Sequence, residues 1–333
     1  MPTVLPMAKA INAGLRAAME RDDKVLMMGE DIGPLGGVFR VTDGLHAQFG
    51  PDRVVDTPLA ESGIVGTAIG LAMAGYRPVC EIQFDGFVFP AFNQITTQLA
   101  KLRYRTGGAV SVPVTIRIPY GGNVGAIEHH SESPEAYFTH TPGLRVVTPA
   151  TAADAWTMTQ QAIFSPDPVI ILEPKSRYWD KAEVDTDAQV DVSEHALAHD
   201  LHAARTVRVG EHLTIAAHGP MVRTALEAAV AAEEDGYSIE VIDLRSLSPL
   251  DVDAVERSVD RTGRLIVVHE APVFGGTGGE LAAQISERCF YALEAPVLRV
   301  GAYYTPYPAN VHEHEYLPTL DRVLDAIDRS FAA

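Results

Sequence analysis

Cysteine is scarce in this chain of 333 residues, which has only Cys80 and Cys289. The two lie far apart and neither belongs to a C-x-x-C pair, so the sequence predicts neither a zinc site nor a disulfide framework. Basic residues are also few, with 26 Lys and Arg against 44 Asp and Glu and a formal net charge of −18. This balance argues against nucleic acid or an anionic membrane as the main partner.

We also expect no export signal, because the printed sequence does not open with a basic segment followed by an apolar one. The first 22 residues instead show the period of an amphipathic helix that begins near Met7. The run of small and apolar residues after Glu61 ends at Tyr76 and Arg77, which is too short to cross a bilayer. We therefore expect a cytoplasmic protein in a reducing compartment, with no membrane partner.

Familiar catalytic fingerprints are missing too. No G-x-S-x-G elbow exists to present a nucleophile, which excludes a serine hydrolase of that kind. The sequence has neither a P-loop nor a G-x-G-x-x-G motif, so assigning it as a NAD oxidoreductase would rest on fold analogy alone. Two glycine-rich segments, GGVFR at 36–40 and FGGTGGE at 274–280, are compatible with phosphate binding, but tight turns need glycine as often.

What the sequence does contain is an alternation of apolar, β-rich runs with helical patterns. The runs at 24–29, 112–118, 145–149 and 168–174 are short and bounded by Gly, Pro or charge, as buried parallel strands are. Similar strands at 212–219, 237–245 and 264–270 follow an acidic stretch that is poor in large apolar residues. We predict an α/β protein with domains at 1–185 and 201–333 and a linker at 186–200.

Glu61 is an acid at the start of a run of small and apolar residues, DTPLAESGIVGTAIGLAMAG at 56–75. Thr57 and Pro58 predict a helix N-cap and first turn, where an acid favours the helix dipole, so a purely structural role is open. Gly66, Gly70 and Ala74 recur every fourth residue and leave one helix face almost without side chains. We expect this helix to be buried in protein, with Glu61 at its N-terminal end.

Two polar segments gather histidines. NVHEHEY at 310–316 places His312 and His314 between acids, as possible metal ligands or, more in keeping with its polarity, as an interface loop. The segment 127–143, IEHHSESPEAYFTHTPG, is too polar for a core strand. It is either a functional loop or a surface loop braced by its own histidines.

The order of motifs resembles the beta subunit of thiamine diphosphate-dependent 2-oxo acid dehydrogenases. The resemblance extends from about residue 4 to about 325 and rests on GEDIG, GGVFR, DTPLAESGIVG, EIQFDGFVFPAFNQI, HHSESPEAYFTHTPGLRVVTPA, EPKSRY, EVIDLRSLSPLD and VVHEAPVFGG. It implies a transketolase-like pyrimidine-binding domain followed by a transketolase C-terminal domain, both with largely parallel sheets.

The resemblance also implies roles for single residues. Glu61 would hydrogen-bond N1′ of the aminopyrimidine of thiamine diphosphate, and Phe87 would stack on that ring with Leu59 and Gln83 beside it. His130 would face the substrate and the incoming lipoyl group, where a change of charge near pH 7 suits proton delivery. Main-chain oxygens of six residues resemble a structural potassium site, namely Val112, Val114, Thr115, Ala162, Ser165 and Asp167.

Thiamine enzymes hold magnesium and the diphosphate with a GDG run, which this chain lacks, so the resemblance implies that the chain provides only half of the cofactor site. The resemblance therefore implies an alpha subunit that supplies the magnesium ligands, in a tetramer of two alpha and two beta chains, with a lipoyl-bearing acyltransferase core as a further partner. HHSESPEAYF and HEAP look closer to members that use branched-chain 2-oxo acids than to those that use pyruvate. Pyruvate and acetoin dehydrogenases remain alternatives, as does a catalytically silent assembly subunit.

Overall fold

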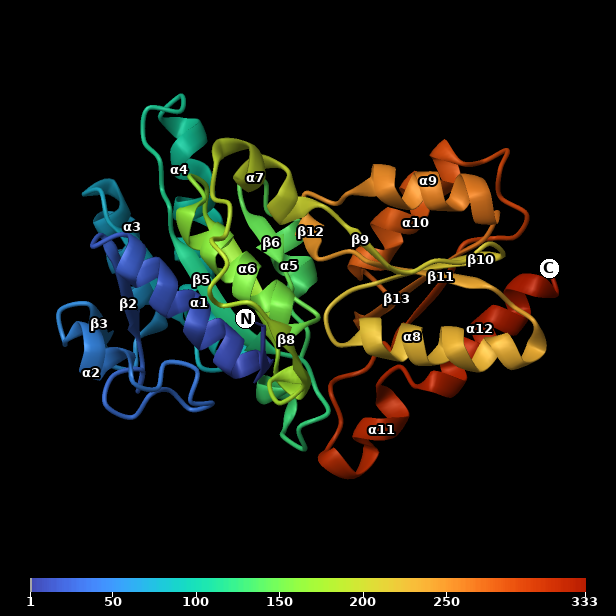
Figure 1. The fold of residues 1–333 in the computed structure, drawn as a ribbon, viewed down its shortest axis with the longest axis horizontal. Coiled ribbons are helices and arrows are strands. Elements are labelled where there is room, and N and C mark those ends of the chain that lie inside the picture. Colours follow the sequence, from blue (N-terminus) through green and yellow to red (C-terminus); the bar gives the residue numbers. More distant parts are fainter. Residues whose placement is uncertain (1) are drawn as a thin grey trace.

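Two largely parallel sheets, one in each half of the chain, organise the computed structural model, which describes residues 2–333 (Figure 1). All neighbouring strands of the first sheet are parallel except β12, which runs antiparallel to β6. Across this sheet the order is β12 (Ser246–Ser248), β6 (Arg145–Val147), β7 (Val169–Pro174), β5 (Thr115–Tyr120), β4 (Arg77–Glu81), β2 (Val25–Gly29) and β3 (Val54–Asp56).

The second sheet is parallel apart from β9, which runs antiparallel to β11 at one edge. The predicted α/β class with two largely parallel sheets is therefore confirmed. The strand order is β14 (Leu298–Ala302), β13 (Leu265–Pro272), β10 (Leu213–Ala217), β11 (Ile239–Asp243) and β9 (Arg205–Arg208).

Helices cover both faces of each sheet. On the first sheet, α1 and α6 pack together over one face, while α3 covers the other with Ile64, Val65 and Ala68. On the second sheet, α8 and α12 lie on one face and α9 and α10 on the other (Figure 1). The longer helices are α1 (Met7–Arg21), α3 (Glu61–Met73), α6 (Ala152–Phe164), α8 (Met221–Ala231), α9 (Val252–Thr262), α10 (Thr277–Arg288) and α12 (Leu320–Phe331), and the short ones are α2 (Leu45–Phe49), α4 (Ala100–Arg105), α5 (Glu135–Thr139), α7 (Glu194–Ala198) and α11 (Glu313–Tyr316).

Local sequence signals account for several helix ends. The Asp251 side chain accepts a hydrogen bond from Ala254 N and caps α9, and Gly263 ends that helix in the left-handed conformation. Thr319 caps α12 in the same way, through Arg322 N. Among residues 2–333, no helix combines the length and the apolar character needed to cross a bilayer.

The predicted start of α3 is wrong. The helix begins at Glu61 rather than at Pro58, and Ala60 precedes it without a side-chain cap. Thr57 N instead donates to Gly29 O at 2.9 Å, which extends the pairing of β3 with β2 and holds the segment before α3 away from helical geometry. Glu61 still lies in the first turn, so the helix-dipole explanation for this acid stays open.

The acidic stretch around the predicted linker carries structure of its own. β8 (Lys181–Val184) pairs antiparallel with β1 (Thr3–Pro6), and α7 packs against α6 of the first sheet. In the other direction, β12 lies after the predicted linker but adds an edge strand to the first sheet. The two halves of the chain therefore share a sheet edge, which the sequence did not indicate.

Candidate active site

The residues predicted for the site follow the carboxyl ends of neighbouring strands. Leu59 and Glu61 follow β3, Gln83 and Phe87 follow β4, and an acid outside the predicted set, Glu30, follows β2. The loop at 121–134 follows β5, the next parallel strand in the sheet. Because these strands are parallel, their carboxyl ends meet at one edge of the sheet, which is where open α/β sheets bind ligands.

A buried ion-pair network fixes this edge. Arg117 of β5 is fully buried, and its Nη1 donates to Glu81 of β4 at 2.5 Å. Its Nε and Nη2 donate to the two oxygens of Glu173 in β7 at 2.7 and 2.8 Å, and the Tyr178 hydroxyl donates to the same carboxylate at 2.7 Å. Removing one partner of such a network leaves an uncompensated buried charge, so the network holds the ends of β4, β5 and β7 in register.

The rings of Phe84, Phe87 and His130 pack against one another at the site, and we call this cluster the aromatic floor. The His130 ring lies 4.2 Å from the Phe84 ring and 5.2 Å from the Phe87 ring, both edge-on, and the two phenylalanines contact each other at 5.8 Å. Phe87 is half-buried, and Nδ1 of His130 is buried without a hydrogen-bond partner among the described residues. The structure thus brings Phe87 and His130, which are distant in sequence, into direct contact.

The surroundings of His130 move its predicted change of charge toward lower pH. Burial lowers the pKa of His130, and the neighbouring His129 lowers it further, while Asp85 opposes the shift. The imidazole therefore takes up a proton at a lower pH than an unperturbed histidine.

A pair of acids, Glu30 and Glu61, lies at the same edge of the sheet, after β2 and β3. Glu61 is 7% exposed, and it raises the pKa of Glu30, for which burial is the larger cause. One carboxylate oxygen of Glu30, Oε1, has no partner among residues 2–333. Gln83 Nε2 donates to Asp31 at 3.0 Å and so connects the end of β4 to the residues that follow β2. Sequence reasoning missed Glu30, although it lies in the GEDIG motif directly after a predicted strand.

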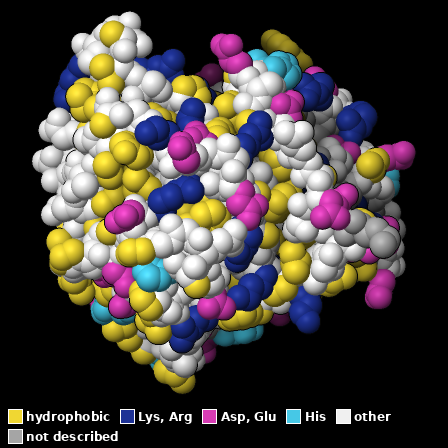
Figure 2. All heavy atoms as spheres, turned by 60° about the vertical axis from the view of Figure 1, so that its left-hand side comes forward, with side chains coloured by type: hydrophobic (Ala, Val, Ile, Leu, Met, Phe, Trp, Pro, Cys, Tyr) yellow, Lys and Arg dark blue, Asp and Glu magenta, His cyan; other side chains and the backbone are white. Residues whose placement is uncertain are grey.

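Leu59 and the small-residue face of α3 are open to solvent. Leu59 is 81% exposed, and Gly66, Gly70 and Ala74 are exposed as well. A Cβ atom added at Gly70 would meet nothing within 4 Å. Figure 2 shows the side of the molecule formed by the first sheet and its helices, where hydrophobic side chains lie among charged ones. The expectation that α3 is buried holds only for its inner face in this chain.

The remaining polar motifs have structural explanations. The glycines at 36–37 have positive φ angles and form a tight loop, with Gly37 N donating to Asp31 O at 2.8 Å. In the second glycine-rich segment, Gly276 and Gly278 pack on the His269 ring, so an added Cβ would collide with it. Within the described residues no cluster of His, Cys, Asp and Glu suits a metal ion, and His312 pairs with Glu315 at 2.8 Å. A structural role is thus favoured at each of the three motifs.

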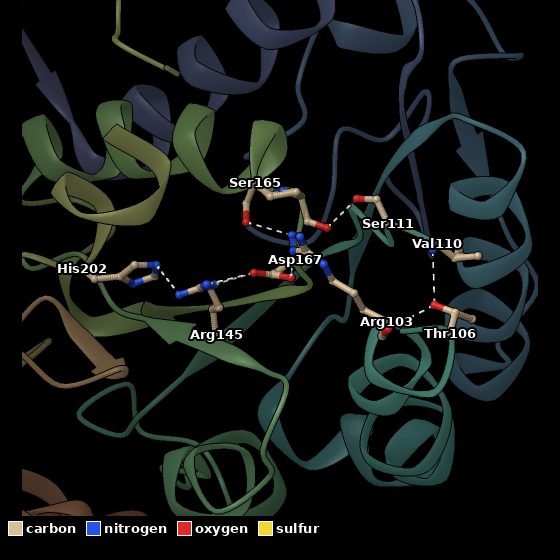
Figure 3. Close-up of polar contacts among 9 residues, drawn as sticks. Arg103, Thr106, Val110, Ser111, Arg145, Ser165, Asp167 and His202 are labelled. Atoms are coloured by element: carbon tan, nitrogen blue, oxygen red, sulfur yellow. Dashed lines mark hydrogen bonds and ion pairs between the residues drawn. The ribbon is translucent and has the colours of Figure 1, made fainter. Parts of the chain in front are cut away.

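Asp167, one of the residues predicted as a potassium site, lies in a polar cluster with Arg103, Arg145 and Ser165 (Figure 3). Arg103 pairs with one oxygen of this carboxylate, and Arg145 donates to the other at 2.8 and 3.1 Å. Burial disfavours the charge of Asp167, but the hydrogen bonds from Arg103 and Arg145 outweigh it and lower the pKa. Arg145 also contacts His202 at 3.3 Å, and Ser165 Oγ accepts a hydrogen bond from Asp167 N at 3.2 Å.

The main-chain oxygens of the set are largely engaged as well. Val112 O accepts from Val114 N at 2.8 Å, Val114 O from Val169 N at 3.0 Å, and Ala162 O from Ser165 N at 3.2 Å. The hydroxyl of Thr115 is buried without a partner among the described residues, but one oxygen does not make a coordination shell. Two guanidinium groups would also repel a nearby cation. The potassium site therefore stays a prediction from the resemblance, and we derive no role for an ion there.

Comparison with protein families gives two consecutive matches. Residues 4–180 match the family described as "Transketolase, pyrimidine binding domain", and residues 202–323 match "Transketolase, C-terminal domain". In fold, the chain is similar to a chain described as "Split gene transketolase, inactive beta4 tetramer", with a TM-score of 0.77 and 23% identity, covering 98% of this chain and 99% of that one.

Curated relatives cover nearly the whole chain. The "Pyruvate dehydrogenase E1 component subunit beta" of Leifsonia xyli subsp. xyli is 61% identical over 98% of this chain and 95% of its own length. The "3-methyl-2-oxobutanoate dehydrogenase subunit beta" of Mycobacterium tuberculosis is 51% identical over 98% of this chain and 91% of its own length. A pyruvate dehydrogenase E1 beta subunit of Staphylococcus epidermidis is 44% identical over 96% of this chain and 97% of its own.

Proposed function

Because this chain belongs to the family of 2-oxo acid dehydrogenase beta subunits, we propose that it forms the decarboxylase component of such a complex together with an alpha subunit. The reaction is the oxidative decarboxylation of a 2-oxo acid, with transfer of the acyl group to a lipoyl domain. The observation that supports this best is the placement of buried Glu61 beside Glu30 at the strand ends that also carry Phe87 and His130.

The residues at this edge fit the pyrimidine half of thiamine diphosphate. Glu30 Oε1 and His130 Nδ1 are buried polar atoms without partners among the described residues, and the His130 ring contacts half-buried Phe87. When bound, the cofactor supplies the electron sink for decarboxylation. We propose that Glu61 holds and exchanges a proton at the pyrimidine through its carboxyl oxygens, and that Phe87, Leu59 and Gln83 orient the ring.

An alpha subunit completes this proposal. The chain lacks the GDG run that would hold magnesium and the diphosphate, so we assign both to the partner. The open face of α3 and the 81% exposed Leu59 give the partner a surface to pack on, close to Glu61. The tetramer of two alpha and two beta chains, the acyltransferase core and the cytoplasmic location stay predictions.

The substrate we propose is a branched-chain 2-oxo acid, on the strength of HHSESPEAYF and HEAP. Pyruvate is the second candidate, because a relative named for pyruvate is 61% identical and one named for 3-methyl-2-oxobutanoate is 51% identical. Both motifs flank one cleft of about 320 Å³, lined in part by Ser133, Tyr137, Glu270 and Pro272.

Reconstitution with the alpha subunit tests the function and the substrate together. We expect turnover only when both chains are present, and specificity constants should be measured for 3-methyl-2-oxobutanoate, pyruvate and 2-oxobutanoate. The branched-chain acid should be preferred. A tenfold preference for pyruvate, equal to about 1.4 kcal/mol in transition-state binding, would move the assignment to the pyruvate type. Turnover by this chain without alpha would contradict the shared site.

His130→Ala should impair acyl transfer to a lipoyl domain more than decarboxylation measured with an artificial electron acceptor. The reason is that we place this imidazole at the second half-reaction, where a proton must be delivered to the dithiolane sulfur. The two rates should be compared on the same reconstituted enzyme, with His140→Ala as a control on the same segment. Equal losses in the two assays would remove the proposed role of His130.

A further inference from the structure

The loop that carries His130 is held from the second half of the chain. It leaves β5 at Gly121, and Gly121 N donates to Glu132 O at 3.0 Å, which closes the loop at its base. Asn123 and Gly125 near its tip are exposed and have positive φ angles of 62° and 73°. Asn and Gly tolerate positive φ angles, but nothing else in the local sequence favours this backbone conformation. Contacts from outside the loop therefore hold it in place.

Glu313 supplies the contacts at the tip. Its carboxylate is 6% exposed and lies at the start of α11, inside the NVHEHEY segment. Oε1 accepts a hydrogen bond from Asn123 N at 2.7 Å, and Oε2 accepts one from Gly125 N at 3.3 Å. The Tyr307 hydroxyl donates to Oε1 at 2.5 Å and fixes the carboxylate. One carboxylate thus binds two backbone N–H groups that lie 190 and 188 residues away in sequence.

Glu270 supplies the contacts near the base. Its Oε1 accepts from Gly122 N at 2.5 Å and from the Ser133 hydroxyl at 3.3 Å, so it bridges the first and last parts of the loop. An added Cβ at Gly121 would lie 2.7 Å from the same oxygen, and one at Gly122 would overlap the Tyr307 hydroxyl. The two glycines are therefore required for the close approach of the second domain.

The loop is also tied to the aromatic floor of the site. Asp85 Oδ2 accepts from Glu132 N at 2.9 Å, and Lys175 Nζ donates to Asp85 Oδ1 at 2.7 Å. Asp85 directly follows Phe84, whose ring contacts His130. The segment with His130 is thus anchored to the first domain at Asp85 and to the second at Glu270 and Glu313.

We propose that Glu313 is a positioning residue, which orders the 121–130 loop through two backbone hydrogen bonds and so sets the orientation of His130 for acyl transfer. Glu313 does not touch the ring of His130, and it acts through the backbone of the loop. The second domain thereby controls a group of the first without adding a side chain to the aromatic floor. The inference rests on the proposed function only for the effect on acyl transfer.

Glu313→Gln in the reconstituted enzyme tests the proposal. Glutamine keeps the size but turns one acceptor into an NH₂ donor that opposes a backbone N–H. We expect hydrogen exchange of the peptide at 121–128 to accelerate by about tenfold or more, the effect of losing a charge-assisted hydrogen bond. Acyl transfer to the lipoyl domain should fall by about tenfold, while decarboxylation with an artificial acceptor should change by less than about twofold.

Glu315→Gln is the matched control, because Glu315 lies in the same helix but its exposed carboxylate pairs with His312 on the surface. It should leave both exchange and the ratio of the two rates unchanged. If Glu313→Gln fails to assemble, Tyr307→Phe removes the hydroxyl that fixes the carboxylate and should give the same changes at smaller size.

Unchanged exchange at 121–128 would overturn the proposed contacts. Faster exchange with an unchanged ratio of rates would overturn the positioning role and leave Glu313 as a contact between domains. A wild-type enzyme that turns over no 2-oxo acid would overturn the proposed function, whereas the exchange measurement would still decide whether Glu313 orders the loop.

Discussion

Glu61→Gln is expected to lower the rate of decarboxylation by roughly 10² to 10⁴, the usual span for a lost acid–base group. Glutamine has nearly the size of glutamate and can still hydrogen-bond the pyrimidine, but it cannot exchange a proton. Assembly and cofactor binding should therefore survive, with at most about 1.5 to 3 kcal/mol lost from a charge-assisted hydrogen bond. The burial of Glu61 beside Glu30 leaves little water to replace the missing carboxyl group.

The helix-dipole explanation of Glu61 predicts the reverse pattern. A glutamine in the first turn of α3 would cost a few tenths of a kcal/mol in stability and leave turnover intact. Exchange of the C2 proton of the bound cofactor, measured together with the melting temperature, separates the two explanations. Glu194→Gln is a matched control, since Glu194 is an exposed acid in the first turn of α7 and should change neither quantity appreciably. Wild-type proton exchange in Glu61→Gln would return this residue to a structural role.

Gly70→Leu is expected to abolish association with the alpha subunit while this chain folds normally. A Cβ atom added at this position would meet nothing within 4 Å, and leucine is a better helix former than glycine by roughly 0.5 to 1 kcal/mol. The separate chain should therefore be as stable as the wild type or slightly more stable. A partner that packs closely on the face formed by Gly66, Gly70 and Ala74 would, however, be displaced by a leucine.

Co-purification with a tagged alpha subunit measures this effect, and thermal unfolding of the separate chain measures its fold. Gly70→Ala should be tolerated because it adds one methyl group, and Ala283→Leu tests an exposed position on α10 of the second domain. The wild-type chain without alpha should retain no thiamine diphosphate in calorimetry, since the magnesium ligands are absent. Normal assembly by Gly70→Leu would place the partner on another surface.

The sequence alone was sufficient for features that depend on short stretches of chain. The length and bounding residues of apolar runs predicted β2, β7 and β13, and the 3.6-residue period predicted α1 from Met7. These predictions succeed because strand and helix signals are contained within a few turns of backbone. The predicted start of α3 was wrong because it depends on a non-local contact. The hydrogen bond from Thr57 N to Gly29 O joins two separate segments, and it overrides the local signal for a helix cap.

The residue types of the site were also available from the sequence, through the motifs around Glu61, Phe87 and His130. Their electrostatic state was not. Glu30 becomes part of the site because β2 and β3 are adjacent and parallel, and the pKa of His130 is lowered because packing buries it next to His129. The resemblance pointed to the main-chain oxygen of Asp167 as a cation ligand, but only the tertiary structure shows that Arg103 and Arg145 reach its carboxylate from other segments.

The tertiary structure alone decided how the second domain serves the first. No local pattern could pair Glu313 with Asn123 and Gly125, or place β12 beside β6. Such contacts depend on the register of strands and on how two separately patterned units pack, and neither quantity is written in any short segment. The sequence therefore determined which residues and elements this protein has, while packing between distant segments determined which of them meet and in what state of charge.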